Sequence, residues 1–130
     1  MVKNSDWDLD YSDGKAGENL VDEVVKQFTT GTIEVKTDRR WASTGNLYIE
    51  TECYYQTSQK WEPSGLSVSK STHYAFVLEG LIVTVPTDVL KHIVKVEGTP
   101  ISTNIEPNPS KGYLIKPEHI LWWYRYAKKD

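Results

Sequence analysis

The chain has a single cysteine, Cys53, among its 130 residues. A disulfide within one chain is therefore excluded, and a reducing compartment such as the cytoplasm is expected. No window approaches the roughly 18 uninterrupted apolar residues of a membrane helix, and residues 1–15 lack the apolar run of a signal peptide. These absences predict a soluble, cytoplasmic protein with no membrane partner.

The sequence also lacks an excess of positive charge. Its formal net charge is -3, so contact with nucleic acid would need a local basic patch. Hydrophobic residues make up 38% of the chain and aromatic residues 12%, which is enough to build a folded core. A length of 130 residues then predicts a single domain, over residues 1–130.

Hydrophobic periodicity predicts both helices and strands. Residues 6–13 are acidic and rich in turn formers, and they lead into an amphipathic helix over 14–28 that Gly31 ends. Strands are expected at 32–37, 46–53, 73–78, 81–86 and 113–116, and further helices at 87–94 and 117–127. Residues 38–45 are expected to form a turn, and residues 54–70 and 97–112 to be irregular.

Local signals define three junctions in this pattern. Glu79 and Gly80 are expected to join two strands as a hairpin, Thr87 is a candidate N-cap, and Pro117 fits the first turn of the last helix. The order of elements predicts an α/β (α+β) fold, with a mixed central β-sheet flanked by helices.

Two strands carry charge on one face and apolar residues on the other. Glu34, Lys36 and Asp38 alternate with apolar residues, and Glu50 lies on the polar face of the next strand. If these strands form a hairpin around residues 38–45, Glu34 lies opposite Glu50, about 5 Å away. A divalent ion such as Mg²⁺ or Mn²⁺ would relieve their repulsion, and Glu18 could add a third oxygen.

A solvent-exposed strand shows the same alternation of charge. The pattern alone therefore leaves both interpretations open, an ordinary solvated face and a metal site.

Three stretches, "GKAGENLVDEVV", "TIEVKTDRRWASTGNLYIETE" and "EPSGLSVSKSTHYAFVL", resemble small, phage-type members of the PD-(D/E)XK nuclease superfamily, including Holliday-junction-resolvase-like proteins. The resemblance covers roughly residues 6–86. It implies a restriction-endonuclease-like fold and Mg²⁺- or Mn²⁺-dependent cleavage of double-stranded or branched DNA, with a homodimer and a bacterial host cytoplasm as further expectations.

The resemblance assigns Glu18 as the acid of the first helix, and Glu34 and Lys36 as the Glu-x-Lys pair. The first-strand acid of the superfamily has no counterpart just before Glu34. In one resolution, Glu34 takes that role and Glu50 supplies the second acid. In the other, Glu34 and Lys36 form the usual motif, and the missing acid is Asp38 or the pair at residues 8 and 10.

The predicted site residues follow from these two resolutions. The predicted catalytic residues are Glu18, Glu34, Lys36 and Glu50. The predicted metal ligands are Glu18, Glu34, Asp38 and Glu50.

Other residues are candidates for contact with nucleic acid. Arg39, Arg40 and Trp41 are expected to meet phosphates and a base, or to form a solvated turn with Trp41 covering the core. Ser64 and Lys70 are expected to bind a phosphate, or to belong only to the segment that precedes the next strand.

Two further sequence features bear on function. The three histidines, His73, His92 and His119, show no zinc-ligand spacing. The aromatic closing helix cannot bury every ring, which leaves surface for a partner. The alternative functions are a catalytically inactive nucleic-acid-binding protein and a phage–host interaction protein.

Overall fold

The computed structural model describes residues 3–104 and 108–127, with side chains for residues 14–104 and 108–123. The chain divides into two compact units, Met1–Thr32 and Ile33–Asp130, and each is described by itself.

The first unit contains one long helix, α1 (Lys3–Thr30). The predicted helix is confirmed, and it begins well before residue 14, so residues 6–13 belong to the helix although they are rich in turn formers. Acidic residues in the first turns of a helix are stabilised by its dipole, which favours continuation of the helix through this segment. Gly31, with a φ of 73°, ends α1 in the left-handed conformation that glycine adopts without strain.

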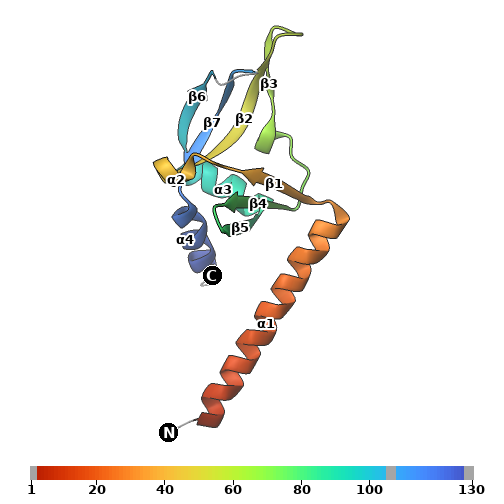
Figure 1. The fold of residues 1–130 in the computed structure, drawn as a ribbon, viewed down its shortest axis with the longest axis vertical. Helices are drawn as coiled ribbons and strands as arrows, with labels where there is room; N and C mark the ends of the chain where they lie inside the picture. Colours follow the sequence, from red (N-terminus) through yellow and green to blue (C-terminus); the bar gives the residue numbers. More distant parts are fainter. Residues whose placement is uncertain (1–2, 105–107, 128–130) are drawn as a thin grey trace. The chain divides into compact units, whose positions relative to one another are not determined.

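The second unit contains two β-sheets (Figure 1). The first sheet has the order β1-β4-β5, built from β1 (Ile33–Thr37), β4 (His73–Leu78) and β5 (Leu81–Pro86). Strand β1 is parallel to β4, and β4 is antiparallel to β5. The predicted hairpin at Glu79 and Gly80 is confirmed, because Leu78 pairs with Leu81 across that two-residue turn.

The second sheet is antiparallel and has the order β3-β2-β7-β6. Its strands are β2 (Leu47–Tyr55), β3 (Lys60–Pro63), β6 (Thr99–Thr103) and β7 (Ser110–Ile115). Residues 54–70 and 97–112 were expected to be irregular, but both segments contain strand residues. Tyr54 pairs with Trp61 in the first segment, and Pro100 pairs with Tyr113 in the second, so contacts distant in sequence create both short strands.

Short helices complete the second unit. They are α2 (Trp41–Thr44), the 3₁₀ turn η1 (Gly65–Ser67), α3 (Thr87–Glu97) and α4 (Pro117–Ala127). Pro117 opens α4 as predicted. Thr87 is not the N-cap of α3, because Pro86 holds that position, and the Thr87 hydroxyl instead lies 3.2 Å from the Ser71 hydroxyl.

One core joins the two sheets and α3. It contains Leu47 and Ile49 of the second sheet, Phe76 of the first, and Leu90 and Ile93 of α3. Each such side chain contributes roughly 1.5–3 kcal/mol by leaving water. The α+β class is confirmed, although the strands divide between two sheets where one was expected. None of the helices described is both long and apolar enough to span a membrane.

Candidate functional site

The predicted hairpin between the two charged strands is wrong. Glu34 of β1 pairs with Tyr74 of β4, whereas Glu50 of β2 pairs with Gly112 of β7. The sixteen-residue interval between Glu34 and Glu50 therefore reflects two strands of different sheets. Strand β4 is largely buried and carries apolar residues on both faces, which is typical of a strand in the interior of a sheet, and it lies between β1 and β5.

The carboxylate of Asp38 accepts hydrogen bonds from the backbone of the segment between β1 and β2. Its Oδ1 accepts hydrogen bonds from the backbone N–H groups of Arg40 (3.0 Å) and Trp41 (3.2 Å), and its Oδ2 accepts one from Tyr48 (3.0 Å). Asp38 therefore ties the start of α2 to the start of β2. These bonds explain its position without a metal ion, and its role as a metal ligand stays a prediction.

Glu34 and Lys36 form an ion pair on β1. The Nζ of Lys36 lies 3.2 Å from Oε1 of Glu34, and both side chains are about half exposed. A pair so open to water contributes little to stability. The ion pair nevertheless keeps the ammonium and the carboxylate close together.

Glu50 is fixed on β2 by its surroundings. The Ser64 hydroxyl donates a 2.8 Å hydrogen bond to Oε2 of Glu50, and Ser64 is itself buried. The backbone of Glu50 lies against Gly65 on one side and Gly112 on the other, where a Cβ atom would collide with it or with Ile49. The register of β2 and β7 shifts directly after Glu50, which marks a β-bulge.

Lys36 and Glu50 meet at one small cavity, although their strands are not paired. The cavity has a volume of about 20 Å³ and is lined by the polar side chains of Lys36, Tyr48 and Glu50, with apolar residues around them. This space is about the size of one water molecule. Lys36 thus pairs with Glu34 and lines a cavity with Glu50, whereas the predicted cross-strand pairing of Glu34 with Glu50 does not form.

The charge of Glu50 affects neighbouring acids. Burial raises the pKa of Tyr48, and Glu50 raises it further, while hydrogen bonds from Ser110 and Thr103 oppose the rise. Burial also raises the pKa of the Cys53 thiol, again with a contribution from Glu50. Both groups therefore stay neutral at pH 7.

The donor set allows a limited test for Mg²⁺. The described side chains, residues 14–104 and 108–123, include no group of three or more His, Cys, Asp or Glu positioned to hold a metal. Mg²⁺ commonly takes one or two carboxylates and completes its shell with water and substrate phosphate. Glu34 and Glu50, each beside Lys36, fit that minimal donor set.

Glu18 belongs to the first unit and lies 3.8 Å from Lys15 in an exposed i,i+3 pair. Its role in catalysis stays a prediction. The side chains at residues 8 and 10 lie outside the described side chains.

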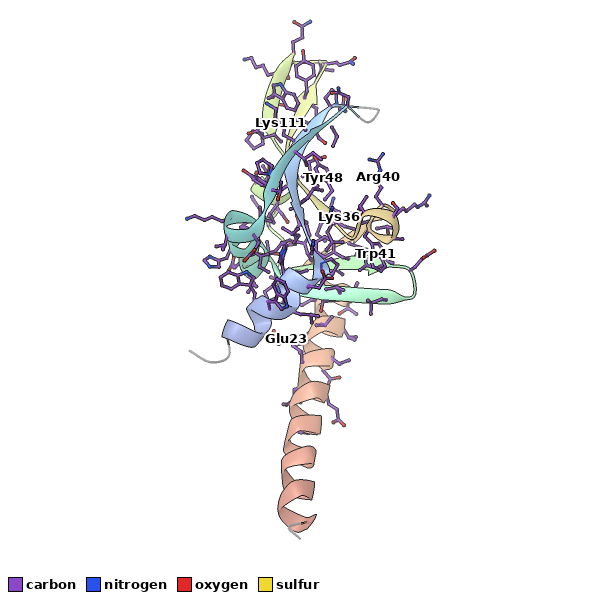
Figure 2. The ribbon with its side chains drawn as sticks, turned by 90° about the vertical axis from the view of Figure 1, so that its left-hand side faces the viewer. Glu23, Lys36, Arg40, Trp41, Tyr48 and Lys111 are labelled. Atoms are coloured by element: carbon purple, nitrogen blue, oxygen red, sulfur yellow. The ribbon has the colours of Figure 1, made fainter. Side chains whose placement is uncertain are left out.

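The residues predicted to contact nucleic acid do not form one cluster. Arg39 and Trp41 line a cavity of about 380 Å³ beside the β4–β5 turn, and Trp41 also packs partly against the core. Arg40 lines a separate cavity of about 170 Å³ with Tyr48. Figure 2 shows Trp41 on the short helix α2 and Arg40 at the start of that helix.

The other two candidates differ in exposure. Ser64 is buried and used by Glu50, whereas Lys70 is exposed.

The histidines are separate from one another. His92 packs edge-on against Trp123, His119 lies 3.7 Å from a Glu97 oxygen, and His73 lies 3.0 Å from the Thr72 hydroxyl. These contacts give each histidine a structural role.

Two features of the site were not predicted from the sequence: Tyr48 lines the cavity with Lys36 and Glu50, and two glycines pack against the backbone of Glu50. Tyr48 lies two residues before Glu50 and so shares its strand face, a signal that the alternation already contained. Gly65 and Gly112 gave no such signal, because their close approach to Glu50 depends on residues distant in sequence.

No protein-family model, curated protein or solved structure matches this chain.

Proposed function

We propose that this protein is a metal-dependent nuclease that hydrolyses phosphodiester bonds in DNA, with Glu34, Lys36 and Glu50 at its active site. One observation carries the proposal: Lys36 and Glu50 line the same water-sized cavity, and Glu34 lies within 3.2 Å of Lys36. The resemblance to PD-(D/E)XK nucleases supplies the substrate class, and homodimer formation and a cytoplasmic location belong to the same proposal.

Each residue has a defined task in this reaction. Glu34 and Glu50 would hold Mg²⁺ through their carboxylates, and Ser64 keeps Glu50 in position. When bound, Mg²⁺ lowers the pKa of water and stabilises negative charge on phosphate oxygens. Lys36 places an ammonium beside the scissile phosphate, where it stabilises the charge that develops as the bond breaks.

A second candidate is a nucleic-acid-binding protein that does not cleave its ligand. It is favoured by the pairing of Glu34 with Lys36 and by the lack of a three-ligand group among the described side chains. A carboxylate already paired with an ammonium binds a cation less strongly, because the ammonium repels the ion.

Cleavage assays separate the two candidates. Linear duplex, single-stranded and four-way-junction DNA are incubated with Mg²⁺, with Mn²⁺ or with EDTA. We expect metal-dependent cleavage by the wild-type protein, and a loss of about 100-fold or more in each of Glu34→Gln, Lys36→Met and Glu50→Gln.

Two matched variants serve as controls. Glu118→Gln and Lys116→Met remove exposed charges at the start of α4 and should keep wild-type activity. Equal cleavage by every variant would indicate a contaminating nuclease and refute the proposal. DNA binding without cleavage in either metal would support the second candidate.

A further inference from the structure

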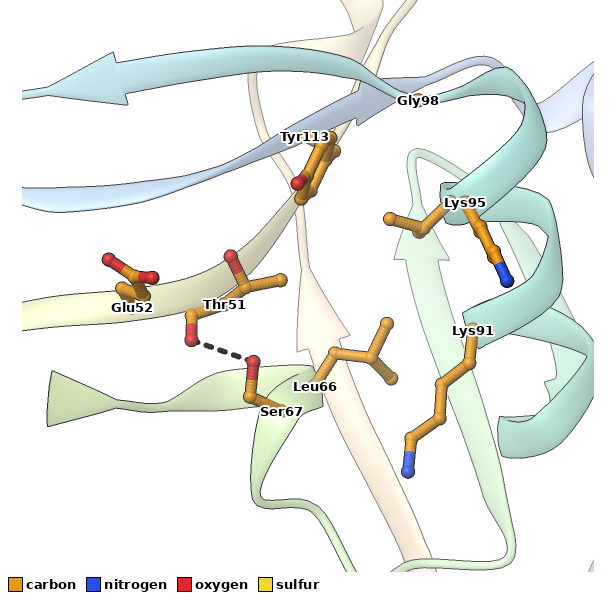
Figure 3. A pocket seen from close by; sticks show the side chains of 9 residues that line it. Thr51, Glu52, Leu66, Ser67, Lys91, Lys95, Gly98 and Tyr113 are labelled. Carbon is orange, nitrogen blue, oxygen red and sulfur yellow. Dashed lines mark hydrogen bonds between the residues drawn. The ribbon is translucent and has the colours of Figure 1, made fainter.

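Two adjoining cavities lie over β2 and β7, and Lys36 lines neither of them. The first has a volume of about 630 Å³, and the second of about 290 Å³. Both are lined by Thr51, Glu52 and Tyr113, so they form one continuous hollow. Figure 3 shows the first cavity, with Tyr113 and Thr51 across from the lysines of α3.

The hollow exists because β7 extends beyond the helix that covers it. Ile115 and Tyr113 lie on the same strand face, but Ile115 is buried in the core whereas Tyr113 is only partly buried. Helix α3 is capped at its C-terminal end by Gly98. A Cβ atom on Gly98 would lie only 3.1 Å from the Cβ atom of Tyr113, so the glycine leaves room for the Tyr113 ring. Past this point the same face of the sheet is open.

Three lysines surround this open face. Lys91 and Lys95 lie one turn apart on α3 at the first cavity, and Lys111 lines the second. The ion pairs among the described side chains involve Lys15, Lys36 and a histidine, and none of these three lysines. Their positive charges are therefore available to a ligand.

Aromatic rings continue the face along the β2–β3 hairpin. The Nζ of Lys111 lies 4.2 Å from the centre of the Trp61 ring, and Tyr54 packs edge-on against Trp61 at 5.6 Å. Trp61 is nevertheless 41% exposed. Figure 2 shows Lys111 in the upper part of this unit, above the labelled Tyr48, Lys36 and Trp41. The cation–π contact thus holds an ammonium group over one face of a partly exposed indole.

One acid opposes these cations. Glu52 is exposed, pairs with Lys111 in the register of β2 and β7, and lines both cavities. Any anionic ligand bound there must lie close to this carboxylate, so Glu52 should weaken its binding.

We propose that this surface binds single-stranded nucleic acid; we call it the lysine–tryptophan face and define it as Tyr54, Trp61, Lys91, Lys95, Lys111 and Tyr113. A strand presents phosphates and bases in alternation, which matches ammonium groups interleaved with aromatic rings. Stacking on an exposed ring needs an unstacked base, and a duplex keeps its bases stacked inside. The choice of nucleic acid rests on the proposed function, but binding at this face does not require hydrolysis.

Fluorescence anisotropy with a labelled, mixed-sequence 20-nucleotide DNA strand tests the proposal. EDTA is present throughout, so no cleavage takes place. We expect Trp61→Ala to weaken binding by about 5- to 150-fold, the loss of one stacked base. The double variant Lys91→Ala/Lys95→Ala should make the slope of log Kd against log salt shallower by about 1.4. Glu52→Gln should tighten binding.

The same hairpin supplies matched controls. Lys60 and Glu62 lie on the opposite face of the hairpin from Trp61, because neighbouring residues of a strand alternate. Lys60→Ala removes one of the two charges that the double variant removes, and Glu62→Gln matches Glu52→Gln. Both controls should leave binding within about twofold of wild type. Trp61→Leu keeps an apolar side chain if Trp61→Ala fails to fold, and it should still lose the stacking.

The outcomes separate this proposal from the nuclease proposal. Binding that depends on Trp61 and the lysines, in a protein that cleaves no DNA, supports the face and refutes hydrolysis. Cleavage with unchanged binding in the Trp61 and lysine variants refutes the face alone. Equal weakening by Lys60→Ala and Lys91→Ala/Lys95→Ala would mean general charge attraction and overturn the proposal. Equally tight, Trp61-dependent binding of polyglutamate would also overturn it, in favour of an acidic protein partner.

Discussion

The Ser64 hydroxyl lies 2.8 Å from Oε2 of Glu50 and donates a hydrogen bond to it, and this bond connects the loop before η1 to β2. A hydrogen bond to a charged group contributes about 1.5–3 kcal/mol. We expect Ser64→Ala to lower the free energy of unfolding by about that amount, as measured by urea denaturation. Ser58→Ala, in the exposed turn between β2 and β3, should change it by less than about 0.5 kcal/mol. Equal stability of both variants would mean that water replaces the Ser64 hydroxyl.

Two glycines hold the backbone of Glu50 in place. A Cβ at Gly112 would collide with the Ile49 carbonyl oxygen and approach Glu50 Cα to 2.9 Å, and a Cβ at Gly65 would collide with the Glu50 carbonyl. Backbone atoms cannot move aside as a flexible side chain does. We therefore expect Gly112→Ala and Gly65→Ala to lower stability by about 3 kcal/mol or more, or to prevent folding.

Gly45 provides the comparison. It also has a positive φ, 75°, but no atom lies within 4 Å of its missing Cβ. Gly45→Ala should cost only about 1 kcal/mol, the penalty of the left-handed conformation. Thermal melts of the three alanine variants would distinguish steric collision from backbone strain. A loss at Gly112 as small as that at Gly45 would show that β2 and β7 can separate.

Local signals predicted several elements of the fold correctly. The hairpin at Glu79 and Gly80, the helix that Pro117 opens and the amphipathic stripe before Gly31 each depend on residues close together in sequence. The class of the fold follows from such elements.

Pairing between distant strands could not be read in the same way. The polar alternation of β1 and β2 allowed a hairpin, but β1 lies parallel to β4, about forty residues later in the chain. The candidate site shows the same division. Its residue types followed from the alternation of Glu34, Lys36 and Glu50, while the support from Ser64 and Gly112 comes from other elements of the fold.

Asp38 offers a test of the metal-ligand prediction. Its carboxylate accepts hydrogen bonds from three backbone N–H groups at the start of α2 and β2. If this is its main role, Asp38→Asn should lose part of the stability, because its single amide oxygen can replace only one of the two accepting carboxylate oxygens. Asp38→Ala, which keeps no acceptor, should lose about 1–2 kcal/mol. Stability is followed by urea denaturation and Mn²⁺ affinity by titration calorimetry. Unchanged stability in Asp38→Ala, with weaker Mn²⁺ binding, would instead favour the ligand role.

The buried thiol of Cys53 predicts how stability depends on pH. Burial raises the pKa of Cys53 above the ordinary thiol value of 9.0, with a contribution from Glu50. The unfolded chain therefore loses this proton at lower pH than the folded protein does. Stability should be constant up to about pH 8 and should fall as pH rises from about 9 through the raised pKa of the folded state.

Urea denaturation between pH 8 and pH 10 measures this fall, and Cys53→Ala is the variant that removes its cause. We expect that variant to be less stable at pH 8, because it loses a buried sulfur, but to lose less stability between pH 9 and pH 10. Tyr48 titrates in the same direction but from an ordinary value of 10.0, so its effect comes mainly at and above the upper end of this range. Cys53 is the smallest of the causes that shift the pKa of Tyr48, so most of this effect remains in both proteins. Parallel curves for wild type and Cys53→Ala would show that the thiol ionises as freely in the folded protein as in the unfolded chain, and that its burial beside Glu50 has no electrostatic consequence.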